Sequence, residues 1–219
     1  MTIAIHAVSA RWQPRTWNSI LERALYQAEK LHGFAAKAPA DLTIIKTKSD
    51  LNAHLLARNA GKKTVGALLG VEGAHPLEGN INNLPKLVDA GYRMIALQHF
   101  FDNALGGSLH SFANKGLTDF GRHVVQYVED NNLILDLAHS SPQVVEDVLA
   151  MSNMPIVVSH TGIHSNCKTT RNYPDPLMKR IAAKGGVIGI GYWADVTCDS
   201  TPTGIAKTIK AAVDLLGVD

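Results

Sequence analysis

Three short apolar runs decide the fold of this chain: Gly66-Ala-Leu-Leu-Gly-Val-Glu72, Leu133-Ile-Leu-Asp-Leu-Ala-His139 and Ile156-Val-Val-Ser-His160. Runs of this length and apolar content are typical of buried strands in a parallel sheet. Each run ends on a residue type that binds metal ions, and the carboxyl ends of parallel strands meet at the edge where α/β proteins build active sites. One carboxylate and two imidazoles that converge there form a ligand set that suits zinc.

Segments with helical spacing separate the apolar runs, and this alternation predicts an α/β protein with a parallel sheet. Strands are expected at residues 2–8, 42–45, 65–71, 94–97, 133–137, 156–158 and 187–190. Helices are expected at residues 17–31, 47–59, 82–90, 118–129, 142–151, 176–184 and 202–216. Ser49 is a candidate N-cap of the second helix, Thr118 of the fourth, and Gly91 should end the third. Because no linker or repeat interrupts the sequence, we expect one domain over residues 1–219.

The composition is that of a globular protein, with 46% hydrophobic and 18% charged residues among 219, enough for one sizeable core. The net charge is +2 and the basic residues are scattered, which argues against a nucleic-acid partner. No apolar run approaches the length that spans a bilayer, so no transmembrane segment is expected. The first residues lack the pattern of a signal peptide, which favours the cytoplasm without settling the compartment.

Cys167 and Cys198 are the two cysteines, and they do not make a disulfide framework. Their expected loop positions permit a pair. Two unpaired thiols in a reducing compartment are the favoured interpretation.

The segment from His99 to Leu117 shows little regular pattern and contains Gly106-Gly107 together with two histidines. Long irregular segments inside a compact domain tend to be functional. Because this one follows an expected strand, it should lie at the candidate active site.

Six motifs occur in a fixed order along the chain. They are Val71-Glu-Gly-Ala-His75, Gly91-Tyr-Arg-Met-Ile-Ala-Leu-Gln-His99 with Asn103, Gly116-Leu-Thr-Asp-Phe-Gly121, Asp136-Leu-Ala-His-Ser140, Pro155-Ile-Val-Val-Ser-His160 and Arg171-Asn-Tyr-Pro-Asp175. In this order and spacing they resemble the membrane dipeptidase (renal dipeptidase) family of zinc peptidases, peptidase family M19. The resemblance implies a (β/α)8 TIM barrel of the metal-dependent hydrolase type with a binuclear zinc centre, in which a metal-bound hydroxide hydrolyses dipeptides.

The resemblance also assigns roles to individual residues of this sequence. It implies that Glu72 is a bridging carboxylate and that His139 and His160 ligate the second zinc. Glu72 and His99 become the candidate catalytic residues. His99 and Arg171, with Asn103 beside them, become the candidate substrate-binding residues, since Arg171 can grip a carboxylate with two parallel hydrogen bonds and His99 can polarise a carbonyl oxygen.

This sequence departs from the family pattern at both ends. The family holds its other zinc with a His-x-Asp motif on the first strand, and no such motif occurs here. The last residues, Leu215-Leu-Gly-Val-Asp219, stand where the eighth strand with its aspartate should begin. A family tyrosine near the seventh strand is replaced around Tyr192-Trp193. We therefore expect a truncated barrel that lacks strands 1 and 8, at most one well-formed zinc site, and low or absent activity of this chain.

A barrel without two adjacent strands exposes two unpaired edges, so a second copy or a partner chain is expected to cover them. Two other functions remain open. One is a metal-dependent amidohydrolase that acts on a non-peptide substrate such as a lactone or a cyclic amide, and the other is a non-catalytic fragment or binding module. Asp136 is expected to be hydrogen-bonded in the core, where a carboxylate can orient a ligand histidine. Structural or solvated positions are expected for His6, His32, His54 and His123, while His75, His110 and His164 are candidates for lining the pocket.

Overall fold

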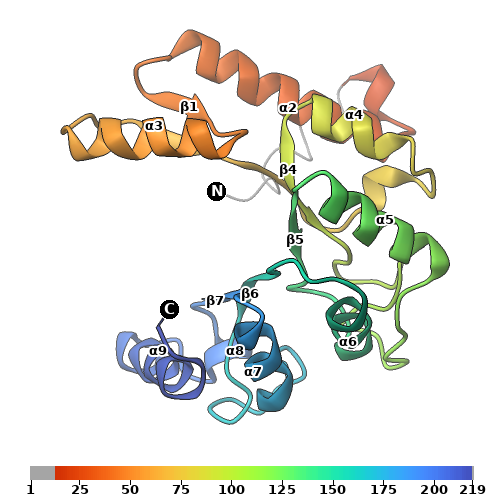
Figure 1. Ribbon diagram of the computed structural model, residues 1–219, viewed down its shortest axis with the longest axis vertical. Helices are drawn as coiled ribbons and strands as arrows, with labels where there is room; N and C mark the ends of the chain where they lie inside the picture. The colour runs from red at the N-terminus through yellow and green to blue at the C-terminus, as the bar shows by residue number, and fades with distance from the viewer. Residues whose placement is uncertain (1–12, 219) are drawn as a thin grey trace. The chain divides into compact units, whose positions relative to one another are not determined.

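Strands and helices alternate along residues 13–218, which the computed structural model describes (Figure 1). The expected strand at residues 2–8, with His6, lies outside the described residues. The chain divides between Ile95 and Ala96 into two compact units. Each unit is α/β with parallel strands, as the sequence predicts.

The first unit contains two pairs of parallel strands, β1 with β2 and β3 with β4. In chain order its elements are η2 (Pro14–Thr16), α2 (Ile20–Lys37), β1 (Leu42–Ile44), α3 (Lys48–Asn59), β2 (Val65–Ala67), β3 (Leu69–Val71), η3 (His75–Leu77), α4 (Asn83–Asp89) and β4 (Tyr92–Ala96). Its core is apolar, and Leu77, Leu84 and Leu87 are fully buried.

The apolar run of residues 65–71 is divided, although the sequence predicts one buried strand. β2 pairs with β1, whereas β3 pairs with β4, so the two halves follow different neighbours. The first half is largely exposed, with Val65 at 59% exposure, while Leu69 and Val71 are buried. The prediction of one continuous buried strand is therefore wrong, and Glu72 follows directly after the buried half.

Local caps set the ends of two helices in this unit. Thr47 caps α3: its hydroxyl accepts the Asp50 N–H while the Asp50 carboxylate accepts the Thr47 N–H. Ser49 lies inside the helix, so the prediction that it is the cap is wrong. Gly91 follows α4 with a φ of 104°, a conformation that glycine adopts without strain, as the sequence predicts.

The second unit carries three parallel strands in the order β5-β6-β7. In chain order its elements are α5 (Asp119–Asp130), β5 (Ile134–Asp136), α6 (Pro142–Met151), β6 (Val157–Thr161), α7 (Asp175–Ala183), β7 (Val187–Ile190), α8 (Ala194–Thr197) and α9 (Pro202–Leu216). The expected bounds of α6, β7 and α9 are confirmed, and α8 is an additional short helix.

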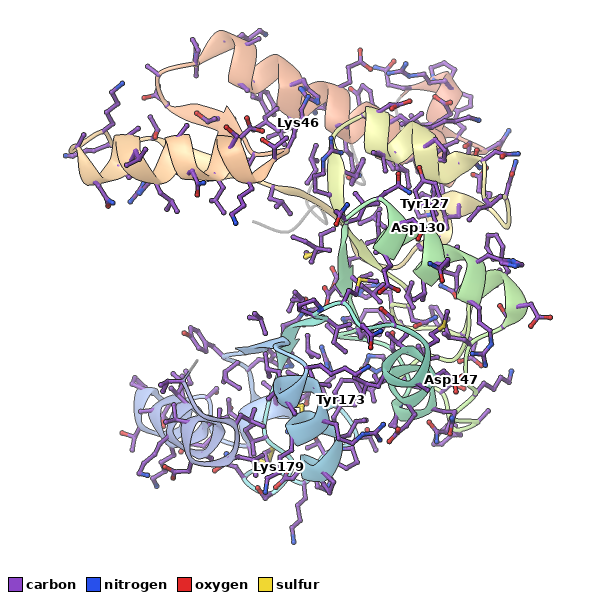
Figure 2. The ribbon with its side chains drawn as sticks, in the orientation of Figure 1. Lys46, Tyr127, Asp130, Asp147, Tyr173 and Lys179 are labelled. Atoms are coloured by element: carbon purple, nitrogen blue, oxygen red, sulfur yellow. A yellow bond between two sulfur atoms is a disulfide. The ribbon has the colours of Figure 1, made fainter. Side chains whose placement is uncertain are left out.

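Branched aliphatic side chains form the core of this unit. Val124, Val128 and Val144 are fully buried, and each such side chain stabilises the fold by roughly 1.5–3 kcal/mol. Thr118 caps α5 by accepting the Gly121 N–H, as expected. Asp147 of α6, labelled in Figure 2, accepts the Leu117 N–H at 2.8 Å and so ties the end of the long irregular segment to this helix.

Candidate metal centre

Two histidines from neighbouring parallel strands face each other in the second unit. His139 follows β5, whereas His160 lies inside β6, because that strand continues to Thr161. Their Nε2 atoms are 2.9 Å apart and their ring centroids 4.8 Å apart. The sequence prediction that these strand ends bring His139 and His160 together is confirmed.

A buried carboxylate orients His160 through a serine. Asp136 is 2% exposed and accepts the Ser159 hydroxyl at 2.5 Å and the Ser159 N–H at 3.0 Å. Because the single hydroxyl proton points to Asp136, Ser159 Oγ accepts from His160 Nδ1–H, which lies 2.8 Å away. The His160 proton is thereby placed on Nδ1, and Nε2 is turned toward His139. Asp136 is hydrogen-bonded in the core, as expected, and it contacts His160 through Ser159.

Aromatic and imidazole rings surround His139 on its other sides. The His99 ring meets it edge-on at 4.6 Å between centroids, and Phe100 packs against the His99 ring at 4.4 Å. His110 Nε2 lies 3.0 Å from His139 Nδ1. Burial lowers the pKa of His110, and electrostatic interactions with the nearby His139, Arg171 and His99 lower it further.

Arg171 lies next to His160, and its side chain is buried. It is 7% exposed, and its Nη2 donates to the His160 carbonyl oxygen at 2.8 Å. Its guanidinium lies 5.7 Å from the centre of the Trp193 ring, which is itself 5.8 Å from the His160 ring. An arginine fixed in this way is pre-arranged to receive an anionic group.

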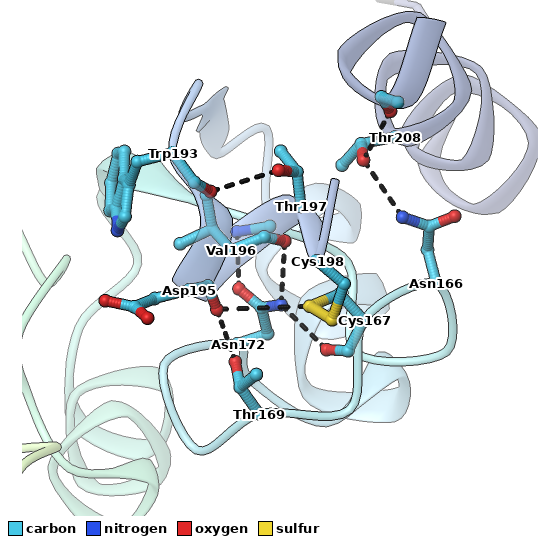
Figure 3. The surroundings of a disulfide bond; sticks show 12 residues. Asn166, Cys167, Thr169, Asn172, Trp193, Asp195, Val196, Thr197, Cys198 and Thr208 are labelled. Atoms are coloured by element: carbon cyan, nitrogen blue, oxygen red, sulfur yellow. Dashed lines mark hydrogen bonds between the residues drawn. A yellow bond between two sulfur atoms is a disulfide. The ribbon is translucent and has the colours of Figure 1, made fainter. Parts of the chain in front are cut away.

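A disulfide joins Cys167 to Cys198, with the two Cα atoms 5.5 Å apart (Figure 3). The interpretation of two unpaired thiols is therefore wrong: the segments after β6 and after β7 bring the two residues together. Asn172 strengthens the same junction, since its amide donates to the carbonyl oxygens of Cys167 and Val196. The disulfide thus holds the segment from which Arg171 projects.

Tyr173 fixes the turn that carries His139. The single proton of its hydroxyl is shared between the carbonyl oxygens of Leu137 and Ser140, and the side chain, labelled in Figure 2, is fully buried. Burial raises the pKa of this phenol, which keeps it a donor at physiological pH. Asn172 and Tyr173 lie within the motif that begins at Arg171, yet sequence reasoning gave them no role. Their position beside Arg171 was the available signal.

Asn103 lies near the site, but its amide is engaged with the backbone of its own segment. Nδ2 donates to the Leu97 carbonyl oxygen at 2.6 Å, and Oδ1 accepts the Leu105 N–H at 2.9 Å. These bonds shape the loop after β4. Direct contact of Asn103 with a substrate stays a prediction.

Glu72 belongs to the first unit, where it directly follows β3 and is half-buried. Gly73, with a φ of 82°, allows the chain to turn sharply after it toward η3. Glu72, His139 and His160 each offer a ligand atom of a kind that could hold a metal ion. That Glu72 joins the two imidazoles stays a prediction.

The separation of the His139 and His160 Nε2 atoms is compatible with binding of both to one metal ion. Ligand nitrogens about 2.0–2.1 Å from a tetrahedral zinc lie roughly 3.3 Å from each other. The observed Nε2 separation of 2.9 Å is close to this value, and Ser159 already turns one of the two nitrogens toward the other. A parallel α/β fold with such a site near the carboxyl ends of its strands is an arrangement that metal-dependent hydrolases use.

The sequence model of the membrane dipeptidase family, peptidase family M19, matches residues 2–219. The chain belongs to this family. A curated relative, an uncharacterised dipeptidase of Schizosaccharomyces pombe, is 26% identical over 210 residues, which are 90% of this chain and 50% of the relative.

Solved structures show the same fold. An amidohydrolase from Pseudomonas aeruginosa superposes with a TM-score of 0.81 at 21% identity and covers 92% of this chain and 61% of its own. A metallopeptidase from Rhodobacter sphaeroides, liganded with a phosphinate mimic of the dipeptide L-Ala-D-Ala, gives a TM-score of 0.75 at 21% identity and covers 89% and 58%.

The chain spans about half the length of the curated relative it matches. Among residues 13–218, no helix combines the length and the apolar character that crossing a membrane requires.

Proposed function

We propose that this chain takes part in the metal-dependent hydrolysis of dipeptides, with zinc as the metal. The observation that carries the proposal is the facing Nε2 pair of His139 and His160, whose rings are held by hydrogen bonds at Nδ1. Metal-ligating histidines are held in this way, because the second ring nitrogen fixes the orientation of the first. Membership of the membrane dipeptidase family supports the same reaction.

Glu72 is proposed as the third ligand, since a carboxylate with two imidazoles is a common catalytic zinc set. When bound, the metal supplies Lewis acidity and acidifies water. The sequence contains no His-x-Asp motif, so at most one well-formed site is proposed for this chain. With one metal site in place of the two of the family, the isolated chain is proposed to have low or absent activity.

The substrate is proposed to be recognised by its free carboxylate and its peptide carbonyl. Arg171 would bind the carboxylate, because its buried guanidinium is held by the His160 carbonyl oxygen and packs over Trp193. His99, with its ring against His139, would donate a hydrogen bond to the carbonyl oxygen. The Rhodobacter sphaeroides metallopeptidase with its dipeptide mimic is consistent with this substrate class.

We further propose that the described strands belong to a (β/α)8 barrel fold and that a second copy or a partner chain covers α3. Exposed leucines on α3 support a covering partner: Leu51, Leu55 and Leu56 are 43%, 48% and 70% exposed. The Cys167–Cys198 disulfide counts against the expected cytoplasmic location, because disulfides persist in oxidising compartments.

Binding measurements test the proposed function without requiring turnover. Zinc should bind with one equivalent per chain, and His139→Ala should abolish this binding. In the zinc-loaded chain, Arg171→Met should weaken binding of a dipeptide about 10- to 100-fold, since a hydrogen bond to a charged group contributes about 1.5–3 kcal/mol. The same dipeptide with an amidated C-terminus is the matched control, and its affinity should change little.

Other outcomes separate the remaining functions. Equal loss of affinity for the dipeptide and its amide would contradict the role of Arg171. Turnover of a neutral lactone that is insensitive to Arg171→Met would favour the amidohydrolase. A chain that binds neither zinc nor dipeptide would be a non-catalytic module.

A further inference from the structure

His110 reaches His139 from the irregular segment after β4, which is tied to the turn after β5 by its backbone. Leu109 N–H donates to the His139 carbonyl oxygen at 2.8 Å, and Ser141 N–H donates to the Gly107 carbonyl oxygen at 2.9 Å. Ser108 and Ser140 form an antiparallel bridge between these two bonds. The segment is therefore docked along the residues that carry His139, with His110 directly after the docked stretch.

Side-chain and close backbone contacts fix the path of this segment. Asp102 accepts the Ser108 N–H at 2.8 Å, and the Ser108 hydroxyl donates to the His99 carbonyl oxygen at 2.6 Å. At Gly107 a Cβ atom would lie 2.3 Å from the Lys115 carbonyl oxygen, so only glycine permits this approach. These constraints set where the His110 ring stands.

The backbone bond from Leu109 holds the main chain of His139 but leaves the rotation of its ring undetermined. That rotation is restrained by the bond between His110 Nε2 and His139 Nδ1, which are 3.0 Å apart. Phe100 packs against both rings, 4.9 Å from the His110 centroid and 5.8 Å from that of His139. With Nδ1 engaged by His110, Nε2 of His139 is directed toward His160.

We propose that His110 is a positioning residue for His139, corresponding to what Ser159 does for His160. The proposal rests on the proposed function, in which His139 and His160 are metal ligands. It assigns the segment of residues 99–117 a defined task, since that segment holds both the backbone and the ring of one ligand. The His110 imidazole thus stands where carboxylates and carbonyl oxygens usually orient metal-binding histidines.

The test compares Co²⁺ binding to the full chain and to three variants, using competition with a chelator and the visible spectrum of the bound ion. His110→Ala should weaken Co²⁺ binding about 10- to 100-fold and alter the spectrum, as losses of an orienting partner do. His110→Gln should restore most of the affinity, because its amide reaches the position of Nε2. His123→Ala removes an exposed histidine of α5 and should leave binding unchanged.

A structural contribution of His110 is separated by two further measurements. Unfolding of the metal-free chain by denaturant should give similar stability for the Ala and Gln variants, although their Co²⁺ affinities differ. In the metal-free chain, ¹⁵N resonances of the His139 ring should shift in His110→Ala, while those of His160 stay in place. Wild-type Co²⁺ affinity in His110→Ala, equal weakening in Ala and Gln, or unmoved His139 resonances would each overturn the proposal.

Failure of the proposed function has a different signature. If the unmodified chain binds no Co²⁺, the proposal that His139 and His160 are metal ligands is wrong. The ring resonances then still decide whether His110 orients His139.

Discussion

Removing the Ser159 hydroxyl is the sharpest test of how the candidate metal centre is built. Ser159→Ala deletes two hydrogen bonds, one to the Asp136 carboxylate and one from His160 Nδ1, and leaves the backbone bond from Ser159 N–H to Asp136. The substitution removes one oxygen atom and adds no bulk. Its effect should therefore concentrate on the orientation of His160.

The expected loss of metal affinity can be worked from the freedom that the ring gains. Without Ser159 the imidazole has two flip states and two tautomers, and if these were equally populated, one productive state in four would weaken binding about fourfold. The variant also loses the hydrogen bonds from His160 through Ser159 to Asp136, which polarise the imidazole, and this loss weakens metal binding further. Losses of such partners amount to about 10- to 100-fold, or ~1.4–2.7 kcal/mol.

Zinc affinity measured by competition with a chelator is the assay, and Thr118→Ala is the matched control. Thr118 also makes one bond as donor, to the Ala104 carbonyl oxygen, and one as acceptor, from the Gly121 N–H. Its removal should destabilise the fold by about 0.5–2 kcal/mol without affecting zinc. Equal zinc affinity in Ser159→Ala and the unmodified chain, or equal weakening in the two variants, would refute the reasoning.

Two further predictions concern stability. The Cys167–Cys198 disulfide closes a loop with a sequence separation of 31 residues, and a loop of this size is expected to stabilise the fold by roughly 3–4 kcal/mol. The double variant Cys167→Ser with Cys198→Ser should therefore lower the free energy of unfolding, measured in denaturant, by that amount. Adding a reductant to the double variant should have no further effect. The Ser108 N–H, together with Lys115 and Ser111, lowers the pKa of Asp102. Because the folded-state pKa is below the unfolded value of about 3.9, the stabilisation is present above that pH and is lost as the pH falls through the folded value. Stability of Asp102→Asn should therefore depend less on pH in this acid range, and an unchanged pH profile would contradict the assignment.

Local sequence signals predicted most of the elements. The Pro142–Met151 and Pro202–Leu216 helices begin at a proline that follows a capping serine or threonine, and their predicted bounds are those observed. Such signals act between residues a few positions apart, so the sequence reveals them directly. Thr47 and Ser49 are both of a capping residue type and lie two positions apart. The reciprocal hydrogen bonds between Thr47 and Asp50 show that Thr47 is the cap of α3.

The candidate site was predicted in part. The strand ends indicated His139 and His160, since the carboxyl ends of neighbouring parallel strands lie together. The motif order supplied Glu72, His99 and Arg171, whose chemical roles remain proposals. The sequence does not indicate a role for Ser159, although it directly precedes His160, because a serine in a strand gives no sign of which partner its hydroxyl has.

The sequence by itself determined the alternation of strand and helix, several helix bounds and the two histidines near the carboxyl ends of adjacent strands, because these follow from periodicity and from short-range hydrogen bonding. The tertiary structure decided the division of the run at residues 65–71, the pairing of Cys167 with Cys198, and the contact of His110 with His139. Each of these depends on which segments distant in sequence become neighbours. Only packing fixes such neighbours, and in doing so it orients the imidazoles that the strands bring together.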